Sequence, residues 1–223
     1  MSPLFKQRTF SSESAALAQG ACISELPSVL RRWQEPGCQL ALWRRQLAPD
    51  LVRRLDRLPF AALPSARFTT APEEASRKLE ASLLASPLHD GVLRAALVHD
   101  MAHLVMLFAS ATGSPEIEVR IEAVDDDACR RFHTDVTYAR LVTTYIGWGT
   151  VWVPPEHAGE ALRMQDAYAG PICQMPRFTV GLFGGSEGPT SGLVHRSPRI
   201  AGTGTFRLFF CVNRASRPPA RLH

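Results

Sequence analysis

The chain has 223 residues, of which 45% are hydrophobic and 21% charged, and its formal net charge is +4. This is the composition of a soluble globular protein with one main domain and a sizeable core, and it excludes an intrinsically disordered or collagen-like chain. The basic residues form no block of five or six and no stripe interleaved with aromatic residues. Nucleic acid is therefore not an expected partner.

The first half of the chain is predicted to be mainly helical. Residues 1–20 are rich in Ser and Ala, and we expect them to form a flexible N-terminus. In residues 21–112 the spacing of apolar residues predicts a short helix at 26–33 and a strand at 38–43. Three longer helices are predicted at 49–58, 71–84 and 93–110. Apolar residues recur along one face of the last helix at three- and four-residue spacings, as in a helix packed on a core.

Alternating apolar and polar residues replace the helical pattern after residue 112. Strands are predicted at 117–123, 136–146, 150–153, 178–183, 192–195 and 205–213, with Gly- and Pro-bearing turns between them. Short strands at this spacing are typical of a sandwich or barrel-like pair of sheets, which we assign to residues 113–213. The Arg- and Pro-rich residues 214–223 are expected to form a flexible tail.

The five cysteines are widely spaced and form no CxxC pair, so they are expected to be thiols in a reducing compartment. The N-terminal residues lack the apolar core of a signal peptide. The longest apolar stretch is interrupted by His99, Asp100 and His103. We therefore expect a cytoplasmic protein without a membrane span.

The most informative pattern is a His-x-Asp sequence, His133 and Asp135, at the entrance of the strand predicted at 136–146. In extended backbone, residues i and i+2 point to the same face, so the imidazole and the carboxylate can bind one ion. His195, 60 residues after Asp135, lies on a later predicted strand and can supply a second imidazole. Two His and one carboxylate occupy one face of an octahedral Fe(II) ion and leave three positions open. We predict these three residues as metal ligands and catalytic site.

Arg207 is the second informative residue, because it is a charge within a predicted strand that is otherwise apolar on both faces. A buried guanidinium must be paired or reach solvent, and its geometry suits a carboxylate bound through two parallel hydrogen bonds. With the three metal ligands, Arg207 gives the chain a pattern similar to that of Fe(II)/2-oxoglutarate dioxygenases, whose fold is the double-stranded β-helix. This similarity implies that Arg207 binds the distal carboxylate of 2-oxoglutarate, a role that Arg199 or Arg140 could take instead.

Hydroxyl groups on the strand after Asp135 are further candidates for binding the co-substrate. Tyr138, Thr143 and Tyr145 could each offer one, although aromatic and β-branched residues are favoured in any strand. We predict Thr143 and Tyr145 as cofactor-binding residues next to Arg207. The predicted fold class is thus α+β, with N-terminal helices packed on a C-terminal double-stranded β-helix, also described as a jelly-roll or cupin-like fold.

Two weaker patterns concern other cation sites. His99 and His103 lie one turn apart on a predicted helix, in a sequence that imitates the His-Glu-x-x-His zinc motif with Asp in place of Glu. Asp is a methylene shorter than Glu, and no convincing third ligand follows, so both His are expected on the polar face of that helix. The acidic run 125–127 is expected to form a solvated turn, with a second cation as the alternative. The glycine-rich segment 184–188 is not a P-loop, since no Gly-Lys-Ser/Thr follows.

Several segments of the second half form a family pattern. Residues 121–135, 140–145, 149–152 and 193–198, with their Phe-His-x-Asp and His-Arg-Ser-Pro sequences, resemble the bacterial DUF1826 family of unknown function. The resemblance extends from about Trp43 onward. It implies a cytoplasmic protein with no established reaction and a link to zinc-homeostasis gene neighbourhoods. Trp148 stands between two glycines where Pro is expected, a departure that concerns the geometry of this turn and not the ligands.

The leading hypothesis is a 2-oxoglutarate-dependent hydroxylase in which His133, Asp135 and His195 hold Fe(II) and Arg207 binds the co-substrate. The sequence does not specify its prime substrate, a small molecule or a protein, or its oligomeric state. The alternative is a non-enzymatic jelly-roll metal-binding protein linked to zinc homeostasis, since the same ligands bind Zn(II) at least as readily as Fe(II). Arg207 separates the two hypotheses, because a metal-binding protein has no need of a guanidinium in an apolar strand.

Overall fold

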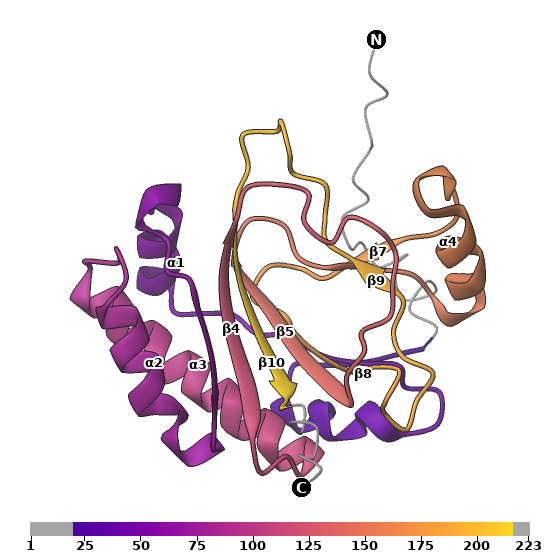
Figure 1. Ribbon diagram of the computed structural model, residues 1–223, viewed down its shortest axis with the longest axis horizontal. Coiled ribbons are helices and arrows are strands. Elements are labelled where there is room, and N and C mark those ends of the chain that lie inside the picture. The colour runs from indigo at the N-terminus through magenta and orange to yellow at the C-terminus, as the bar shows by residue number, and fades with distance from the viewer. Residues whose placement is uncertain (1–19, 216–223) are drawn as a thin grey trace, which may run out of the picture.

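The computed structural model describes residues 20–215 (Figure 1). The flexible ends predicted at 1–20 and 214–223 lie almost entirely outside these residues. Arg214, the first residue of the predicted tail, instead ends a strand, and the next residue, Ala215, donates its amide hydrogen to the carbonyl of Glu116.

The described residues form four α-helices, several short 3₁₀ helices and ten strands. The helical elements are η2 (Pro27–Gln34), α1 (Pro49–Asp56), η3 (Phe60–Ala62), η4 (Pro72–Glu74), α2 (Ala75–Leu84), α3 (Gly91–Thr112), η5 (Pro155–His157), α4 (Ala158–Met164) and η6 (Gln165–Ala167). The strands are β1 (Ala21–Ser24), β2 (Leu40–Trp43), β3 (Ala66–Thr70), β4 (Ile117–Val124), β5 (Ala139–Ile146), β6 (Val151–Trp152), β7 (Cys173–Gln174), β8 (Val180–Gly184), β9 (His195–Arg196) and β10 (Arg207–Arg214).

The strands form a large and a small sheet. The large sheet has the order β1-β2-β8-β5-β10-β4-β3, and all its neighbours are antiparallel except β1 and β2. The small sheet has the order β7-β6-β9, and an isolated antiparallel bridge between His133 and His195 extends it by one position. The protein is therefore mixed α+β with a mostly antiparallel large sheet. Three of its strands, β1, β2 and β3, come from the part of the chain that was predicted to be mainly helical.

The large sheet separates two layers (Figure 1). The helices α1, α2 and α3 lie on one side of it, and the small sheet lies on the other. Because side chains alternate along a strand, Leu141 and Leu182 pack with the helices, whereas Val142 and Phe183 pack between the two sheets. The space between the sheets is where His133, Asp135, His195 and Arg207 meet.

The helix α3 is the main element of the helical layer. Its first turn is capped by Asp90, whose Oδ1 accepts the amide hydrogens of Val92 and Leu93, and it ends at Gly113 with a left-handed φ of +63°. By length and composition it is the one helix of residues 20–215 that could span a membrane. In this fold its apolar face is buried in the core, through Leu93, Leu97, Met101, Leu104, Val105 and Phe108.

Candidate metal centre and adjoining cavity

The three predicted metal ligands meet at one end of the small sheet. The backbone amides of His133 and His195 each donate to the other's carbonyl oxygen, both at 3.0 Å, so the two imidazole rings lie beside one another with centroids 4.6 Å apart. Asp135, two residues after His133, points to the same side. Its Oδ2 lies 3.3 Å from Nε2 of His195, and its Oδ1 lies 3.6 Å from Nε2 of His133.

This group has the chemistry of a metal site. Each of the three residues offers one ligand atom, and these atoms all lie within 4.8 Å of one another. Among residues 20–215, no other group of three His, Cys, Asp or Glu side chains meets this condition. Oδ2 of Asp135 is buried and has no hydrogen-bond partner. A buried carboxylate oxygen is costly to leave unpaired, and a divalent cation satisfies it. Two imidazoles and one carboxylate are the ligand set of non-haem Fe(II), and the residues present fit that metal.

Backbone carbonyls hold both imidazoles in the orientation that metal binding needs. Nδ1–H of His133 donates to the carbonyl of Arg131 at 2.8 Å, and Nδ1–H of His195 donates to that of Leu193 at 3.0 Å. Each ring therefore presents the lone pair of Nε2 to the metal position. Such hydrogen bonds from the second ring nitrogen fix the tautomer of metal-binding histidines.

The environment sets the protonation of the three ligands. Burial lowers the pKa of His195 to about 4, so this imidazole is neutral at pH 7. Burial acts to raise the pKa of Asp135, but the neighbouring His133 and the positive charge of Arg140 outweigh it, and the net pKa is lowered. The nearby carboxylate of Asp135 raises the pKa of His133. The carboxylate is thus ionised, and protons compete with a metal chiefly at His133.

Arg140 orients the carboxylate of Asp135. Its Nη1–H donates to Oδ1 of Asp135 at 2.6 Å, and its Nε–H donates to Oδ1 of Asn213 at 2.8 Å. Nδ2–H of Asn213 donates in turn to Glu118 at 3.1 Å. Oδ1 of Asp135 is therefore held by a guanidinium, while Oδ2 is left to a metal. Arg140, one of the alternative anchors for 2-oxoglutarate, is engaged in this task.

The side chain of Gln165 holds the His133 segment from its other edge. Its Oε1 accepts the amide hydrogen of Phe132 at 2.9 Å, and its Nε2–H donates to the carbonyl of Phe132 at 3.0 Å. The amide group thus takes the place of a neighbouring strand. Gln165 adopts a φ of +51°, which a residue with a side chain seldom occupies. Sequence patterns gave no signal for this contact, which joins residues 33 positions apart.

We expect Gln165→Ala to lower the affinity for Zn(II) or Fe(II) about tenfold, the lower end of the range for residues that orient metal ligands, because the variant frees one edge of the His133 segment. Competition with a chelating dye measures this affinity. Gln165→Gly is the matched variant, since glycine tolerates the positive φ but cannot make the two hydrogen bonds. If both variants bind metal like the wild type, Gln165 has no part in holding the site.

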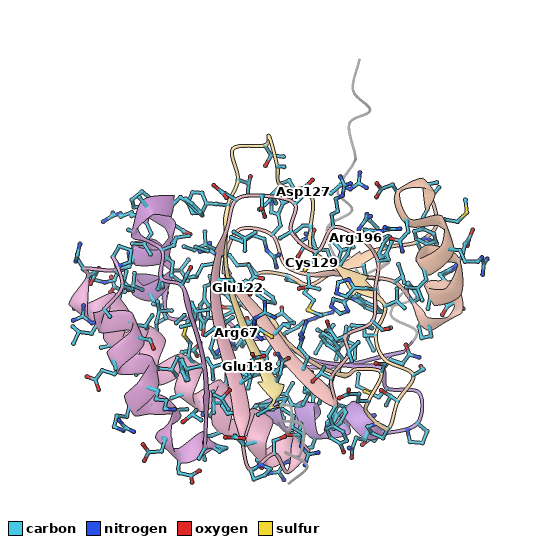
Figure 2. All side chains as sticks on the ribbon, viewed as in Figure 1. Arg67, Glu118, Glu122, Asp127, Cys129 and Arg196 are labelled. Carbon is cyan, nitrogen blue, oxygen red and sulfur yellow. The ribbon has the colours of Figure 1, made fainter. Side chains whose placement is uncertain are left out.

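A cavity adjoins the metal ligands and leads to Arg207. It encloses about 560 Å³, part of which is open to solvent, and its lining includes His133, His195 and Arg207. Glu122 on β4 and Cys129 in the loop that leads to His133 mark two of its sides and are labelled in Figure 2. Two of the predicted metal ligands, His133 and His195, therefore share one cavity with the predicted co-substrate anchor.

Arg207 is a buried cation that forms no ion pair among the described residues, and the charge of Glu122 acts on it from beyond ion-pair distance. Only 2% of the residue is exposed, and no carboxylate within residues 20–215 forms an ion pair with it. Its guanidinium donates to the hydroxyls of Ser197 at 3.2 Å and Thr144 at 3.4 Å, and Nε has no partner. Burial lowers its pKa to about 10, so it remains charged at pH 7. A buried unpaired charge is costly, and a carboxylate of a bound ligand is its natural partner.

Three other predicted co-substrate contacts lie elsewhere. Arg199 pairs with Asp166 on the surface, where 43% of its side chain is exposed. Tyr145 packs in the core on the helical side of the large sheet, and Thr143 shares that side by the alternation of β5. The predicted cofactor-binding role of Thr143 and Tyr145 is therefore corrected. Thr144, which faces Arg207, is the β5 hydroxyl at the cavity.

Tyr145 instead belongs to a buried polar cluster. Its hydroxyl donates to Oδ2 of Asp100 at 2.5 Å, and Asp100 also accepts two hydrogen bonds from Arg45. Asp100, the acidic residue of the zinc-like helix motif, is thus used to join α3 to the sheet. His99 and His103 are exposed on α3, and no third ligand joins them within residues 20–215.

We expect Tyr145→Phe to lower the free energy of unfolding by about 1.5 kcal/mol, since a hydrogen bond to a charged group is lost while Arg45 still pairs with Asp100. Urea denaturation measures this change. Tyr138→Phe is the control, because the hydroxyl of Tyr138 accepts an exposed hydrogen bond from Gln34. The affinity for 2-oxoglutarate should be unchanged in both variants. A loss of that affinity in Tyr145→Phe would restore the original prediction.

The acidic run 125–127 fastens loops together. Oδ1 of Asp127 accepts the amide hydrogens of Ile200 at 2.8 Å and Ala201 at 2.9 Å, and Oδ1 of Asp126 accepts that of Ala128 at 3.0 Å. These contacts place the loop after β4 against the segment that follows His195. These hydrogen bonds give Asp126 and Asp127 a structural role in the loop, so the acidic run does not require a second cation.

Comparisons with known proteins place these features in context. A family model described as "Protein of unknown function (DUF1826)" matches residues 24–213. No curated protein matches the chain.

Solved structures similar to the chain include three proteins with low identity. The dioxygenase for auxin oxidation 1 from Arabidopsis thaliana, in a binary complex with 2-oxoglutarate, has 12% identity and a TM-score of 0.47, with 86% of this chain and 88% of that chain covered. AviO1 from Streptomyces viridochromogenes has 15% identity and a TM-score of 0.44, with 89% and 98% covered. A prolyl-4-hydroxylase from Pseudomonas putida has 14% identity and a TM-score of 0.42, with 86% and 94% covered.

Proposed function

The chain belongs to the DUF1826 family, and we propose that it is an Fe(II)- and 2-oxoglutarate-dependent oxygenase that hydroxylates a second substrate. One observation carries the proposal. The buried Arg207, which forms no ion pair among the described residues, lines the same cavity as the metal-ligand residues His133 and His195. A site that binds only a metal has no use for such a cation.

The strand order supports a jelly-roll for this domain. Four strands of the large sheet follow the order β8-β5-β10-β4, and the facing strands follow β7-β6-β9 with the His133 bridge at the end. Successive segments exchange sheets except β6 and β7, which pair with each other in the small sheet. Eight segments so arranged in two facing antiparallel sheets are typical of a jelly-roll. In this arrangement the metal ligands and Arg207 face one interior.

The residues of the cavity have separate tasks. When bound, Fe(II) with 2-oxoglutarate and dioxygen supplies the oxidation, in which one oxygen atom enters a substrate C–H bond, the other enters succinate, and 2-oxoglutarate loses CO₂. His133, Asp135 and His195 would hold the metal. Arg207 would bind the distal carboxylate of 2-oxoglutarate, with the hydroxyls of Ser197 and Thr144 fixing the guanidinium.

The test is the binding of 2-oxoglutarate to the Fe(II)-loaded protein without oxygen. Purified protein is stripped of metal, loaded with one equivalent of Fe(II), and titrated anaerobically with 2-oxoglutarate while the visible spectrum is recorded. We expect a weak charge-transfer band that saturates. Fe(II) binding without this band and without calorimetric binding of 2-oxoglutarate would contradict the oxygenase proposal and favour the metal-binding alternative.

The second candidate function is that alternative, a metal-binding protein connected with zinc. The ligand set favours it to a degree, since such N and O donors bind Zn(II) more tightly than Fe(II). It leaves the burial of Arg207 beside the site without explanation. For either function we propose a cytoplasmic location, which is supported by the thiol state of all five cysteines.

A further inference from the structure

Two charged residues of β4, Arg120 and Glu122, line the cavity in addition to the groups already assigned. Their register with β10 places Arg120 beside Cys211 and Glu122 beside Phe209. Arg207 lies two residues before Phe209 on the same face of β10. It marks one end of the stretch of cavity wall that β4 and β10 form together.

The other end of the stretch is the metal centre. Asn213 follows Cys211 on the cavity face of β10 and binds Arg140, which holds Asp135. Arg120 and Glu122 therefore lie beside the part of the cavity that separates the co-substrate anchor from the metal ligands. Glu118 and Glu122 follow one another along β4 in Figure 2.

The ion pair between Arg120 and Glu122 is open to exchange. The two side chains are 28% and 34% exposed, so neither is sealed from solvent. Nε of Arg120 is buried without a hydrogen-bond partner, although the guanidinium also contacts Glu122. Arg120 thus has an unused donor. Its ion-pair partner is Glu122, and the charge of Glu118 on the same strand also acts on it.

The charges of the cavity favour an anion as the second substrate. Four arginines line the cavity, and one of them, Arg196, has its guanidinium over the ring of Phe132. The other three, Arg120, Arg140 and Arg207, are opposed by two carboxylates, Glu122 and Asp135. A divalent metal and the dianion of 2-oxoglutarate cancel one another, so one positive charge is left when both are bound. In a partly buried cavity such a charge attracts an anionic ligand.

We propose that Arg120 binds an anionic group, a carboxylate or a phosphate, of the small molecule that is hydroxylated, and that Glu122 occupies Arg120 until this group arrives. This inference rests on the proposed oxygenase function. It assigns the substrate class by charge and gives β4 the role of specificity-determining strand.

Arg196 is the other arginine of the cavity lining, and its guanidinium is engaged elsewhere. It lies 4.1 Å from the ring centre of Phe132, which packs in a separate apolar cluster with Val153 and Ala161. Adjacent residues of a strand point to opposite faces, so Arg196 points away from the face to which its neighbour His195 contributes a ligand. Arg120 is therefore the arginine that the geometry favours.

The test uses the full chain loaded with Zn(II), which is redox-inactive, and saturated with 2-oxoglutarate. Saturation is confirmed first by calorimetry; failure at this step contradicts the proposed function itself. The loaded protein is then titrated with benzoate, phenyl phosphate and neutral benzamide. We expect at least one of the two anions to bind and benzamide not to bind. Binding of neither anion, or equal binding of benzamide, would overturn the proposal.

Variants identify the residue that holds the anion. Arg120→Gln should weaken anion binding at least tenfold, as expected for the loss of a charge-assisted hydrogen bond, and Arg120→Lys should weaken it less. Glu122→Gln should strengthen it, because a competing carboxylate is removed. Arg199→Gln on the surface is the control. The proposal is overturned if Glu122→Gln weakens anion binding, if Arg120→Gln leaves it unchanged, or if the anion displaces 2-oxoglutarate and so occupies the Arg207 position.

Discussion

Replacing His133 or His195 with Ala should abolish stoichiometric binding of Fe(II) or Zn(II) and leave the fold intact. Each variant removes one of three ligands, and an open site contributes less to folding than a closed structural metal site. For the carboxylate ligand, Asp135→Asn is a better substitution than Asp135→Ala, because the amide oxygen can still accept the hydrogen bond from Arg140. Metal content after loading with one equivalent and dialysis measures binding, and circular dichroism with thermal denaturation measures the fold.

The two exposed histidines of α3 are the control for this experiment. His99→Ala and His103→Ala should keep the metal content of the wild type, since these residues lie outside the cavity. If these substitutions remove the metal while the three ligand variants retain it, the site assignment is wrong.

The group of His133, Asp135 and His195 could be predicted from the sequence because the geometry of its first two members is local. His133 and Asp135 point to one side as residues i and i+2, and this holds although the segment forms only a single bridge instead of a strand. Arg207 was recognisable as a charge among apolar strand residues, and its burial bears this out. Such signals depend on neighbours in the chain and on the cost of burying a charge, both of which a sequence displays.

The error on Thr143 and Tyr145 has a simple physical cause. Both are hydroxyl-bearing residues of the strand predicted to follow Asp135, and this prediction disregards the two faces of that strand. The backbone bends at residues 136–138, and β5 begins only at Ala139. The bend shifts the alternation by one residue, so Arg140, Val142 and Thr144 face the site. Such a shift in which residues face the site cannot be predicted without the three-dimensional path of the turn.

The strands missed by the sequence are short or lie at an edge. β7 has two residues, too few for a period of two to be visible, and β1 and β3 are the edge strands of the large sheet. The β3 residues are only partly buried, so their pattern lacks the apolar contrast of a core strand. The contact of Gln165 with Phe132 is equally hidden, because a side-chain amide in the place of a strand leaves no periodic trace.

Arg207→Lys should weaken the binding of 2-oxoglutarate by roughly 10- to 150-fold while the affinity for Fe(II) barely changes. The substitution keeps the positive charge, but an ammonium cannot reproduce the two parallel hydrogen bonds of a guanidinium to a carboxylate. It also loses the pair of hydroxyl contacts that hold Arg207, one to Ser197 and one to Thr144. The measurement is an anaerobic titration of the Fe(II)-loaded protein with 2-oxoglutarate.

Two matched variants make the result specific to the anchor. Arg199→Lys alters an arginine that pairs with Asp166 on the surface and should bind 2-oxoglutarate like the wild type. Thr144→Val removes one hydroxyl that holds the guanidinium and should cause a smaller loss than Arg207→Lys, because the charge and one support remain. Succinate, which has two carboxylates but lacks the keto group that joins the metal, should depend on Arg207 in the same direction. Equal affinity for 2-oxoglutarate in the wild type and in Arg207→Lys would show that the distal carboxylate is bound elsewhere in the cavity.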